Sequence, residues 1–191
     1  MTDTVLGVDI GESAIKAAVL IRGASGFAAR TLAIEPIELT ETDAEDESDK
    51  HERTLAALKE LVRKNGLRGS RCAIALSGEE AAPRLFSFPR LTDPELLANA
   101  IRMEAASEVP FDIEDSLLDW HLYPDELSEE GKSEGVYVAA PRGVVDAHFD
   151  IARSVGLDPV IIDVDGLALT NAFIQCVGGT PPPRETLVVN I

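Results

Sequence analysis

Basic residues are scarce in this chain. It has 17 lysines and arginines against 34 aspartates and glutamates among 191 residues, so its formal net charge is −17. Binding to nucleic acid or to an anionic membrane needs a basic patch, so we expect neither. Because no apolar run approaches the length needed to cross a bilayer, we expect no direct membrane insertion. The opening MTDTV lacks the basic start of a secretory signal, so we expect a cytoplasmic protein unless a partner holds it elsewhere.

Cysteine is also scarce. Cys72 and Cys176 lie far apart in apolar stretches, with no metal-ligand spacing and no nearby histidine. We therefore expect reduced thiols in the protein core and neither a disulfide framework nor a cysteine metal site. The apolar share of 45% is enough for a buried core, and the length suits one domain or two small ones.

The negative charge is concentrated in two runs. Residues 35–52 hold nine acids and one lysine, and residues 125–134 hold five acids and one lysine. Without their combined charge of −12, the rest of the chain carries −5. We interpret both runs as solvated loops that keep the protein soluble, with an acidic docking surface as the alternative.

The first part of the chain predicts the element order β-β-β-α-β. Apolar runs bounded by turn residues predict strands, and leucines that recur on one side predict a helix that stops at Asn65-Gly66. The expected strands are 4–10, 14–21, 26–37 and 71–78, and the expected helix is 52–66.

A second set of elements begins near Arg84. The expected strands are 84–89, 116–124, 135–141 and 158–165, and the expected helices are 93–108, 142–156 and 166–177. A Gly-Pro-rich joint at 178–185 then precedes the apolar strand TLVVNI. Because a domain rarely ends on an unpaired apolar strand, we expect the chain to be a fragment.

The stretch VLGVDIGESAIKAAVL, residues 5–20, places two apolar runs around the polar bend DIGES. A tight bend directs backbone N–H groups into one concavity, which suits a phosphate. Gly11 permits close approach to the backbone, Lys16 supplies a positive charge, and Asp9 suits the water shell of Mg²⁺. The alternative is a plain hairpin turn in which Asp9 bonds its own backbone.

The β-β-β-α-β order with this bend resembles the first half of the actin-like ATPase fold, which actin shares with sugar kinases. The resemblance implies an α/β protein whose first half is actin-like (ribonuclease H-like) and carries an inserted small α+β subdomain. It makes DIGESAIK the first phosphate loop. ATP would then bind at Asp9, Gly11, Glu12, Ser13 and Lys16, and Asp9 would hold Mg²⁺ through water.

Two further stretches are similar to the PilM family of type IV pilus assembly proteins. They are AIRMEAASEVPFDIEDSLLDWHLY at 100–123 and GVYVAAPRGVVDAHFDIARSVGLDPVIIDVDGLALTNAF at 135–173. In that family, as in the cell-division protein FtsA, an unrelated subdomain replaces the usual second subdomain of actin. The implied domains are the first part of subdomain 1A at 1–83, the inserted subdomain 1C at 84–157, the return to 1A at 158–178, and the joint with the first strand of the second half at 179–191.

The resemblance also implies a function. It implies a cytoplasmic platform of a type IV pilus or related secretion machine, which binds ATP when full length and is at most a weak ATPase. Its partners would be other pilus machine proteins and the cytoplasmic N-terminal tail of a PilN-like inner-membrane protein, held in a groove between subdomains. Acidic loops near that groove would favour a tail with Lys or Arg. The alternatives are a sugar kinase and an FtsA-like cell-division protein.

Two acidic residues need separate interpretation. Actin-like proteins usually carry Ser or Thr after the phosphate-loop glycine, whereas this chain has Glu12, whose charge would repel phosphates in a partly dry site. If Glu12 points outward, Ser13 supplies the hydroxyl. With no second phosphate loop, we expect the fragment to bind ATP poorly and to be inactive. Asp165 either orients Mg²⁺-bound water as a catalytic residue or caps the helix that follows it.

Overall fold

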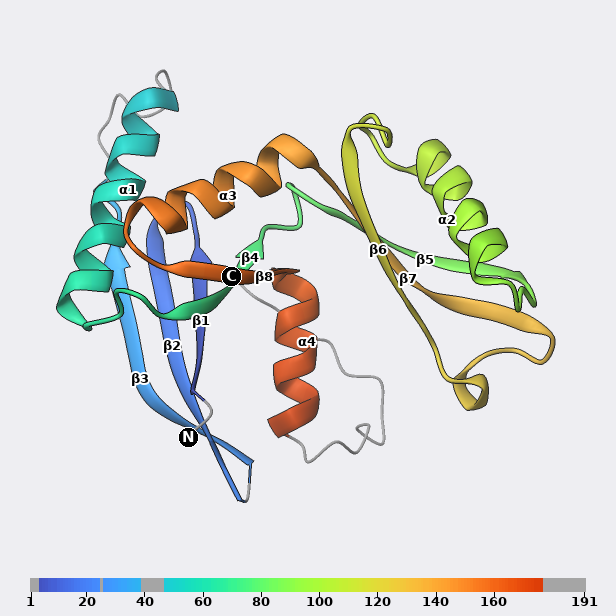
Figure 1. The fold of residues 1–191 in the computed structure, drawn as a ribbon, viewed down its shortest axis with the longest axis horizontal. Coiled ribbons are helices and arrows are strands. Elements are labelled where there is room, and N and C mark those ends of the chain that lie inside the picture. The colour runs from blue at the N-terminus through green and yellow to red at the C-terminus, as the bar shows by residue number, and fades with distance from the viewer. Residues whose placement is uncertain (1–3, 25, 39–46, 177–191) are drawn as a thin grey trace. The chain divides into compact units, whose positions relative to one another are not determined.

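The computed structural model describes residues 4–24, 26–38 and 47–176. The chain divides into two compact units (Figure 1). Unit 1 comprises Met1–Ser77 and Ala147–Ile191, and unit 2 comprises Gly78–Asp146. The joint and strand predicted for 178–191 lie outside the described residues, as do residues 39–46 of the first acidic run.

Unit 1 is built on a five-stranded mixed sheet in the order β3-β2-β1-β4-β8. Strand β1 is antiparallel to β2 and parallel to β4, β2 is antiparallel to β3, and β4 is parallel to β8. The strands are β1 (Thr4–Ile10), β2 (Ala14–Gly23), β3 (Gly26–Pro36), β4 (Arg71–Leu76) and β8 (Asp158–Val164). The helices are α1 (Glu47–Lys64), α4 (Asp165–Cys176) and the C-terminal half of α3 (Arg142–Ser154), which spans the division between the units.

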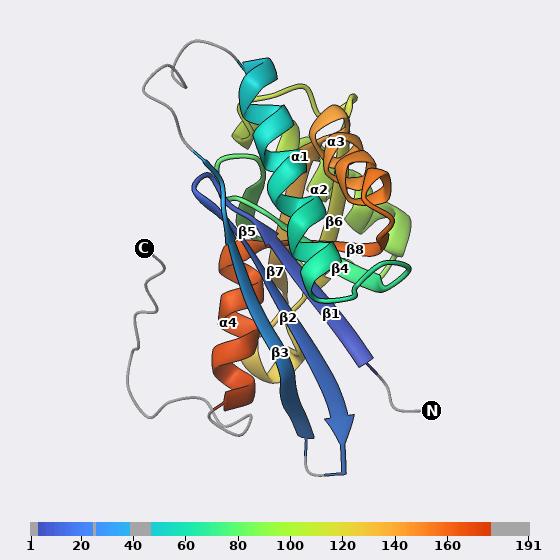
Figure 2. The same cartoon turned by 90° about the vertical axis from the view of Figure 1, so that its left-hand side faces the viewer.

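Alternating side chains give the sheet of unit 1 one fully buried face. In β1, Leu6 and Val8 are buried, and in β4 Cys72 and Ile74 are buried on the same face. This face packs against α1 and the end of α3. Figure 2 shows α1 and α4 on opposite sides of the sheet. We call the side of the sheet that carries α4 the open face. None of the described side chains of α4 is fully buried.

Unit 2 is a three-stranded antiparallel sheet, in the order β5-β7-β6, with α2 packed on one face. Helix α2 begins where the Asp93 carboxylate accepts a hydrogen bond from the Glu95 amide at 2.9 Å, and it ends at Glu108, with Val109 as its C-cap before Pro110. The elements of unit 2 are β5 (Ala82–Pro89), α2 (Pro94–Glu108), β6 (Ser116–Leu122), the 3-10 helix η1 (Asp125–Leu127) and β7 (Lys132–Pro141). The core residues are Phe86, Leu97, Ile101, Ala105, Ile113, Tyr137 and Ala139.

The described parts of both acidic runs include regular structure where the sequence predicted loops. Helix α1 begins at Glu47 rather than at residue 52, in keeping with the stabilising effect of acids such as Asp49 near a helix N-terminus. In the second run, η1 and the first residues of β7 replace part of the loop. There the Asp125 carboxylate accepts a hydrogen bond from Arg90 at 2.8 Å, which ties the run to the end of β5.

Candidate functional site

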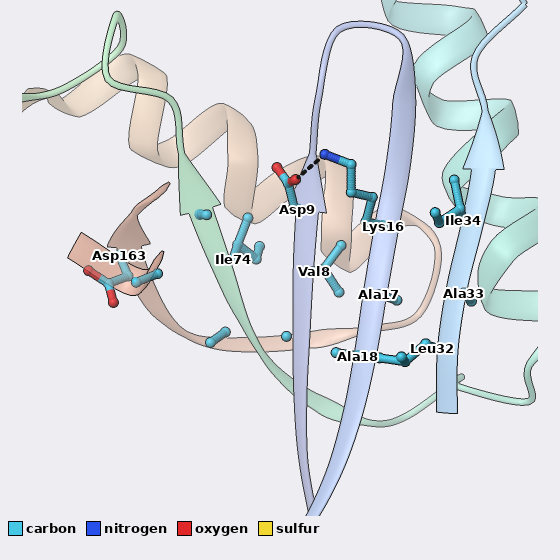
Figure 3. Close-up of a pocket in the computed structure, with 14 residues that line it drawn as sticks. Val8, Asp9, Lys16, Ala17, Ala18, Leu32, Ala33, Ile34, Ile74 and Asp163 are labelled. Carbon is cyan, nitrogen blue, oxygen red and sulfur yellow. Dashed lines mark hydrogen bonds and ion pairs between the residues drawn. The ribbon is translucent and has the colours of Figure 1, made fainter. Parts of the chain in front are cut away.

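The β1–β2 hairpin brings two of the predicted site residues together. Asp9 and Lys16 are directly opposite each other in the antiparallel register, so their side chains lie on the same face of the sheet. Lys16 Nζ lies 3.2 Å from Asp9 Oδ2, and the two side chains are 51% and 42% exposed (Figure 3). The pair is therefore open to water and close to the bend of the hairpin.

The loop between these strands uses part of its backbone internally. The Gly11 amide donates to the Ala14 carbonyl at 3.2 Å, and the Ser13 carbonyl accepts from the Ile37 amide at 2.9 Å. A Cβ atom on Gly11 would lie 3.0 Å from that Ala14 oxygen, so glycine fits the turn better than any larger residue. One of the amides expected to face a phosphate is thus already engaged in the turn.

The Glu12 side chain lies on the outside of this loop. It is 90% exposed, and its Oε1 lies 3.6 Å from Lys50 Nζ in the first turn of α1. Water therefore surrounds the carboxylate, and a cation from a neighbouring element lies beside it. In such surroundings its interaction with another charge is weak, unlike the repulsion expected for a partly dry site.

A cavity of about 490 Å³ lies on the open face of unit 1, with the Asp9–Lys16 pair among its lining residues. The strand registers place Ile34, Lys16, Asp9, Ala75 and Asp163 in one row across the five strands. Small residues make much of the remaining lining, which lets the backbone come close to an occupant. These small residues are Gly7, Ala17, Ala18, Ala33, Ala73, Ala75 and Ala168.

The two aspartates at the end of β8 have different places. Asp163 is a lining residue of the cavity, and its Oδ1 also accepts from the Val164 amide at 2.8 Å. Asp165 is the first residue of α4, where its Oδ1 accepts from the Gly166 amide at 2.6 Å, and it is not a lining residue of the cavity. The contact of Asp165 is local to the helix start, whereas Asp163 shares the row of Asp9.

The donor set fits a phosphate-bearing ligand better than a bare metal ion. Among the residues that the structure describes, no group of three His, Cys, Asp or Glu side chains is placed to hold a metal. Mg²⁺ commonly keeps several waters and uses one or two carboxylates together with phosphate oxygens. Asp9, with Lys16 beside it, could supply one such carboxylate, and Asp163 lies in the same row two strands away.

Comparison with known proteins now decides the family. The family described as "Type IV pilus assembly protein PilM" matches residues 7–191. The chain belongs to the PilM family. No curated relative matches the chain.

Two solved structures share the PilM-type fold of this chain. One, described as the "PilM-PilN type IV pilus biogenesis complex", is 26% identical, with a TM-score of 0.71 over 92% of this chain and 51% of the other. The other is the cytoplasmic domain of EpsL, an inner membrane component of the type II secretion system of Vibrio cholerae. It is 15% identical, with a TM-score of 0.56 over 87% of this chain and 59% of the other. The present chain thus spans about half the length of the PilM-type chain in the complex.

These matches confirm the predicted family and the predicted actin-like α/β fold class. The separate three-stranded sheet of unit 2 is the observed counterpart of a small α+β unit. Within the described ranges, no helix is long and apolar enough to span a membrane. The roles of the individual site residues stay predictions.

Proposed function

We propose that this chain is part of a cytoplasmic, actin-like platform of a type IV pilus or related secretion machine. The complete platform binds ATP and captures the cytoplasmic N-terminal tail of a PilN-like inner-membrane protein, which holds it at the membrane beside other machine proteins. The observation that carries this proposal is the likeness, over 92% of the chain, to a structure described as a PilM–PilN complex.

The nucleotide would bind at the cavity on the open face. In this proposal Lys16 approaches a phosphate as a point charge, and the amides of Glu12 and Ser13 face it, since the described bonds of the loop use other groups. Gly11 keeps the turn tight, and Asp9 holds the water shell of Mg²⁺. Because the PilM-type relative is about twice as long as this chain, the chain supplies one side of the site.

Asp163 at the end of β8 and Asp165 at the start of α4 would have different roles. Asp163 faces the same cavity as Asp9 and is the better placed of the two to order water on Mg²⁺. Asp165, for which the sequence left catalysis and helix capping open, would act by fixing the start of α4 through its contact with the Gly166 amide. Any ATPase activity of the complete protein is expected to be weak.

Unit 2 would be the inserted subdomain of the family. The sequence placed this subdomain at 84–157 between two parts of subdomain 1A, and the compact unit runs from Gly78 to Asp146. Its sheet is separate from that of unit 1, and its three strands and one helix form their own core. A partner tail would be recognised with the help of this unit.

Partner capture can be tested directly. Synthetic cytoplasmic tails of inner-membrane pilus proteins from the same cell are immobilised, and the protein is passed over each tail and over a scrambled tail of equal composition. We expect retention by one intact tail and none by its scrambled form. Failure of every intact tail to retain a folded protein that contains the whole platform would overturn the proposed partner.

Nucleotide binding needs a separate measurement. Calorimetry with Mg-ATP is run on the platform and on its Lys16→Ala variant, with Lys59→Ala as a control that removes the same charge from the exposed side of α1. We expect binding that depends on Lys16 and not on Lys59. Equal affinities for all three proteins would remove the phosphate-loop assignment and leave partner capture untouched.

A further inference from the structure

Four strands form the free edges of the two sheets in the described part of the chain: β3 and β8 in unit 1, and β5 and β6 in unit 2. Free edges can pair with foreign strands, and proteins usually protect them with prolines, bulges or charges. Both edges of unit 1 have a register shift in the pairing next to them. Prolines also lie in three of the four edges: Pro36 in β3, Pro159 in β8, and Pro83 and Pro89 in β5.

Strand β6 is the exception. It contains no proline, and its pairing with β7 runs without a shift from Ser116↔Pro141 to Leu122↔Gly135. A regular strand without proline offers a straight row of backbone donors and acceptors. Of the four described edges, β6 alone has neither a proline nor a register shift in its pairing.

The outward backbone groups of β6 can be identified from its ladder. Tyr123 N donates to the carbonyl of Glu134, the residue opposite it, at 2.8 Å. Because bonded and non-bonded pairs alternate in an antiparallel ladder, the backbone groups of Leu118, Trp120 and Leu122 point away from β7. These three residues offer their N–H and C=O groups at the free edge.

One of these outward amides is held by a side chain. Asp119 Oδ1 accepts a hydrogen bond from Trp120 N at 2.8 Å. Asp119 is exposed, and among the described residues no cation forms an ion pair with it. A foreign strand can replace the carboxylate with its own carbonyl at this amide, and the charged Asp119 side chain can accept hydrogen bonds from a cation at its other positions.

The side chains around the edge show what would fit there. Trp120 and Leu122 are 36% and 40% exposed and share one face of β6, whereas Asp119 lies on the other. Residues 112–130 hold eight acids and no lysine or arginine. Three of these acids are paired with cations: Asp125 with Arg90 at 2.8 Å, Glu114 with Arg102 at 3.8 Å, and Glu129 with Lys132. The net charge of −17 on every copy of the chain disfavours a second copy as the occupant.

We propose that the free edge of β6 binds an extended segment of a protein partner that carries lysine or arginine. The segment adds as a fourth strand to the sheet of unit 2, with backbone bonds to Leu118, Trp120 and Leu122. Its alternate side chains divide between the two faces. The basic ones meet Asp119, and the apolar ones cover Trp120 and Leu122. This surface goes beyond the proposed function, since it requires neither a nucleotide nor a PilN-like tail.

The single tryptophan of the chain gives the test a built-in reporter, because Trp120 lies on the edge itself. An eight-residue peptide of alternating lysine and valine is titrated into the whole protein. We expect a saturable change in tryptophan fluorescence and shifts of the backbone NMR signals of 118–122. A peptide with glutamate in place of lysine should produce neither change. No saturable change with the lysine peptide would overturn the proposal.

Backbone pairing is tested by a peptide of the same sequence whose amides on the docking edge are N-methylated. It keeps every side chain and charge, so the protein needs no alteration. The loss of two backbone hydrogen bonds should weaken binding by about tenfold or more. Equal binding by both peptides would mean that the contact is electrostatic only, which contradicts strand addition.

Two pairs of variants locate the contact. Asp119→Asn keeps an acceptor for the Trp120 amide and removes the charge, whereas Glu126→Gln removes an equal charge from η1. We expect Asp119→Asn to weaken binding of the lysine peptide and to reduce the salt dependence of that binding. We expect Glu126→Gln to change both little. Leu122→Pro deletes an outward amide and should weaken binding more than Leu122→Ala.

Sedimentation of the protein without peptide tests whether a second copy of the chain occupies the β6 edge instead. We expect a species that does not self-associate through β6, so that Leu122→Pro leaves the sedimentation coefficient unchanged. A dimer that Leu122→Pro abolishes would assign the edge to a second copy and overturn the proposal. If an immobilised PilN-like tail retains the protein but the lysine peptide does not change the Trp120 fluorescence, the proposed function holds and only the β6 surface is rejected.

Discussion

Lys16 Nζ lies 3.2 Å from Asp9 Oδ2 across the first hairpin, with both side chains about half exposed. Such a pair contributes little to folding, because water screens both charges. The pair also lines the cavity of the open face, where the proposed function has Lys16 bind a phosphate. Stability and ligand binding should therefore respond differently to its removal.

Removal of Lys16 separates these two effects. For Lys16→Ala we expect the free energy of unfolding to change by about 0–1 kcal/mol in urea titrations, because the pair is exposed. We expect the affinity for Mg-ATP to fall by about tenfold or more, since a charge-assisted contact to phosphate is lost. Lys59→Ala is the matched control. A large loss of stability with unchanged affinity would show that Lys16 has a structural role only.

For Glu12, unlike Lys16, we expect substitution to change the affinity for Mg-ATP only slightly. Its carboxylate is 90% exposed and lies 3.6 Å from Lys50, so its effect on a phosphate is limited to about 1 kcal/mol in water. We expect Glu12→Ser to change Mg-ATP affinity by less than about fivefold in calorimetry. Glu12→Gln, which keeps the size of the side chain, should behave alike. A much larger gain in affinity for both variants would mean that the carboxylate turns toward the phosphates.

The sequence predicted the order of the elements well because each strand is a short apolar run between turn residues. Leu6 and Val8, for example, alternate with Gly7 and Asp9, and this alternation alone indicates a strand with one buried face. The family resemblance then supplied the fold class, which the comparisons confirm. The start of α1 was placed too late, because acids read as loop residues also favour a helix N-terminus.

The contents of the candidate site were harder to predict, because they depend on pairing between distant strands. Asp163 reaches the row of Asp9 because β4 lies between β1 and β8, so that Ala75 pairs with both. Nothing local to residues 158–165 reveals that register, so the sequence pointed to Asp165, with catalysis and helix capping left open, and not to Asp163. The orientation of the Glu12 side chain likewise depends on Lys50, which lies in α1 and far from Glu12 in the sequence.

The end of α1 predicts a dependence on acid. Arg63 donates two hydrogen bonds to Glu60, at 2.7 and 2.6 Å, and with Lys64 nearby it lowers the pKa of Glu60 from 4.5 to about 2. Because the folded-state pKa lies below the unfolded one, this stabilisation is present above pH 4.5 and is lost as the pH falls toward 2.

We therefore expect Glu60→Gln to lower the free energy of unfolding at neutral pH and to match the unaltered protein near pH 2. Unfolding by urea at a series of pH values measures the difference, and added salt should reduce it because the carboxylate is exposed to solvent. Glu52→Gln removes the same charge from the same helix as a control. A difference that persists unchanged at pH 2 would contradict the ion pair as its cause.

Tyr137 offers a test of the core of unit 2. Its side chain is fully buried beside Phe86, burial raises the pKa of its phenol, and its hydroxyl has no hydrogen-bond partner among the described residues. A buried polar group without a partner destabilises the folded state, so Tyr137→Phe should leave stability unchanged or raise it by about 1 kcal/mol. Tyr137→Ala, which leaves a cavity, should cost about 3–5 kcal/mol. Chemical unfolding measures both, and a clear loss of stability in Tyr137→Phe would show that the hydroxyl is bonded in solution.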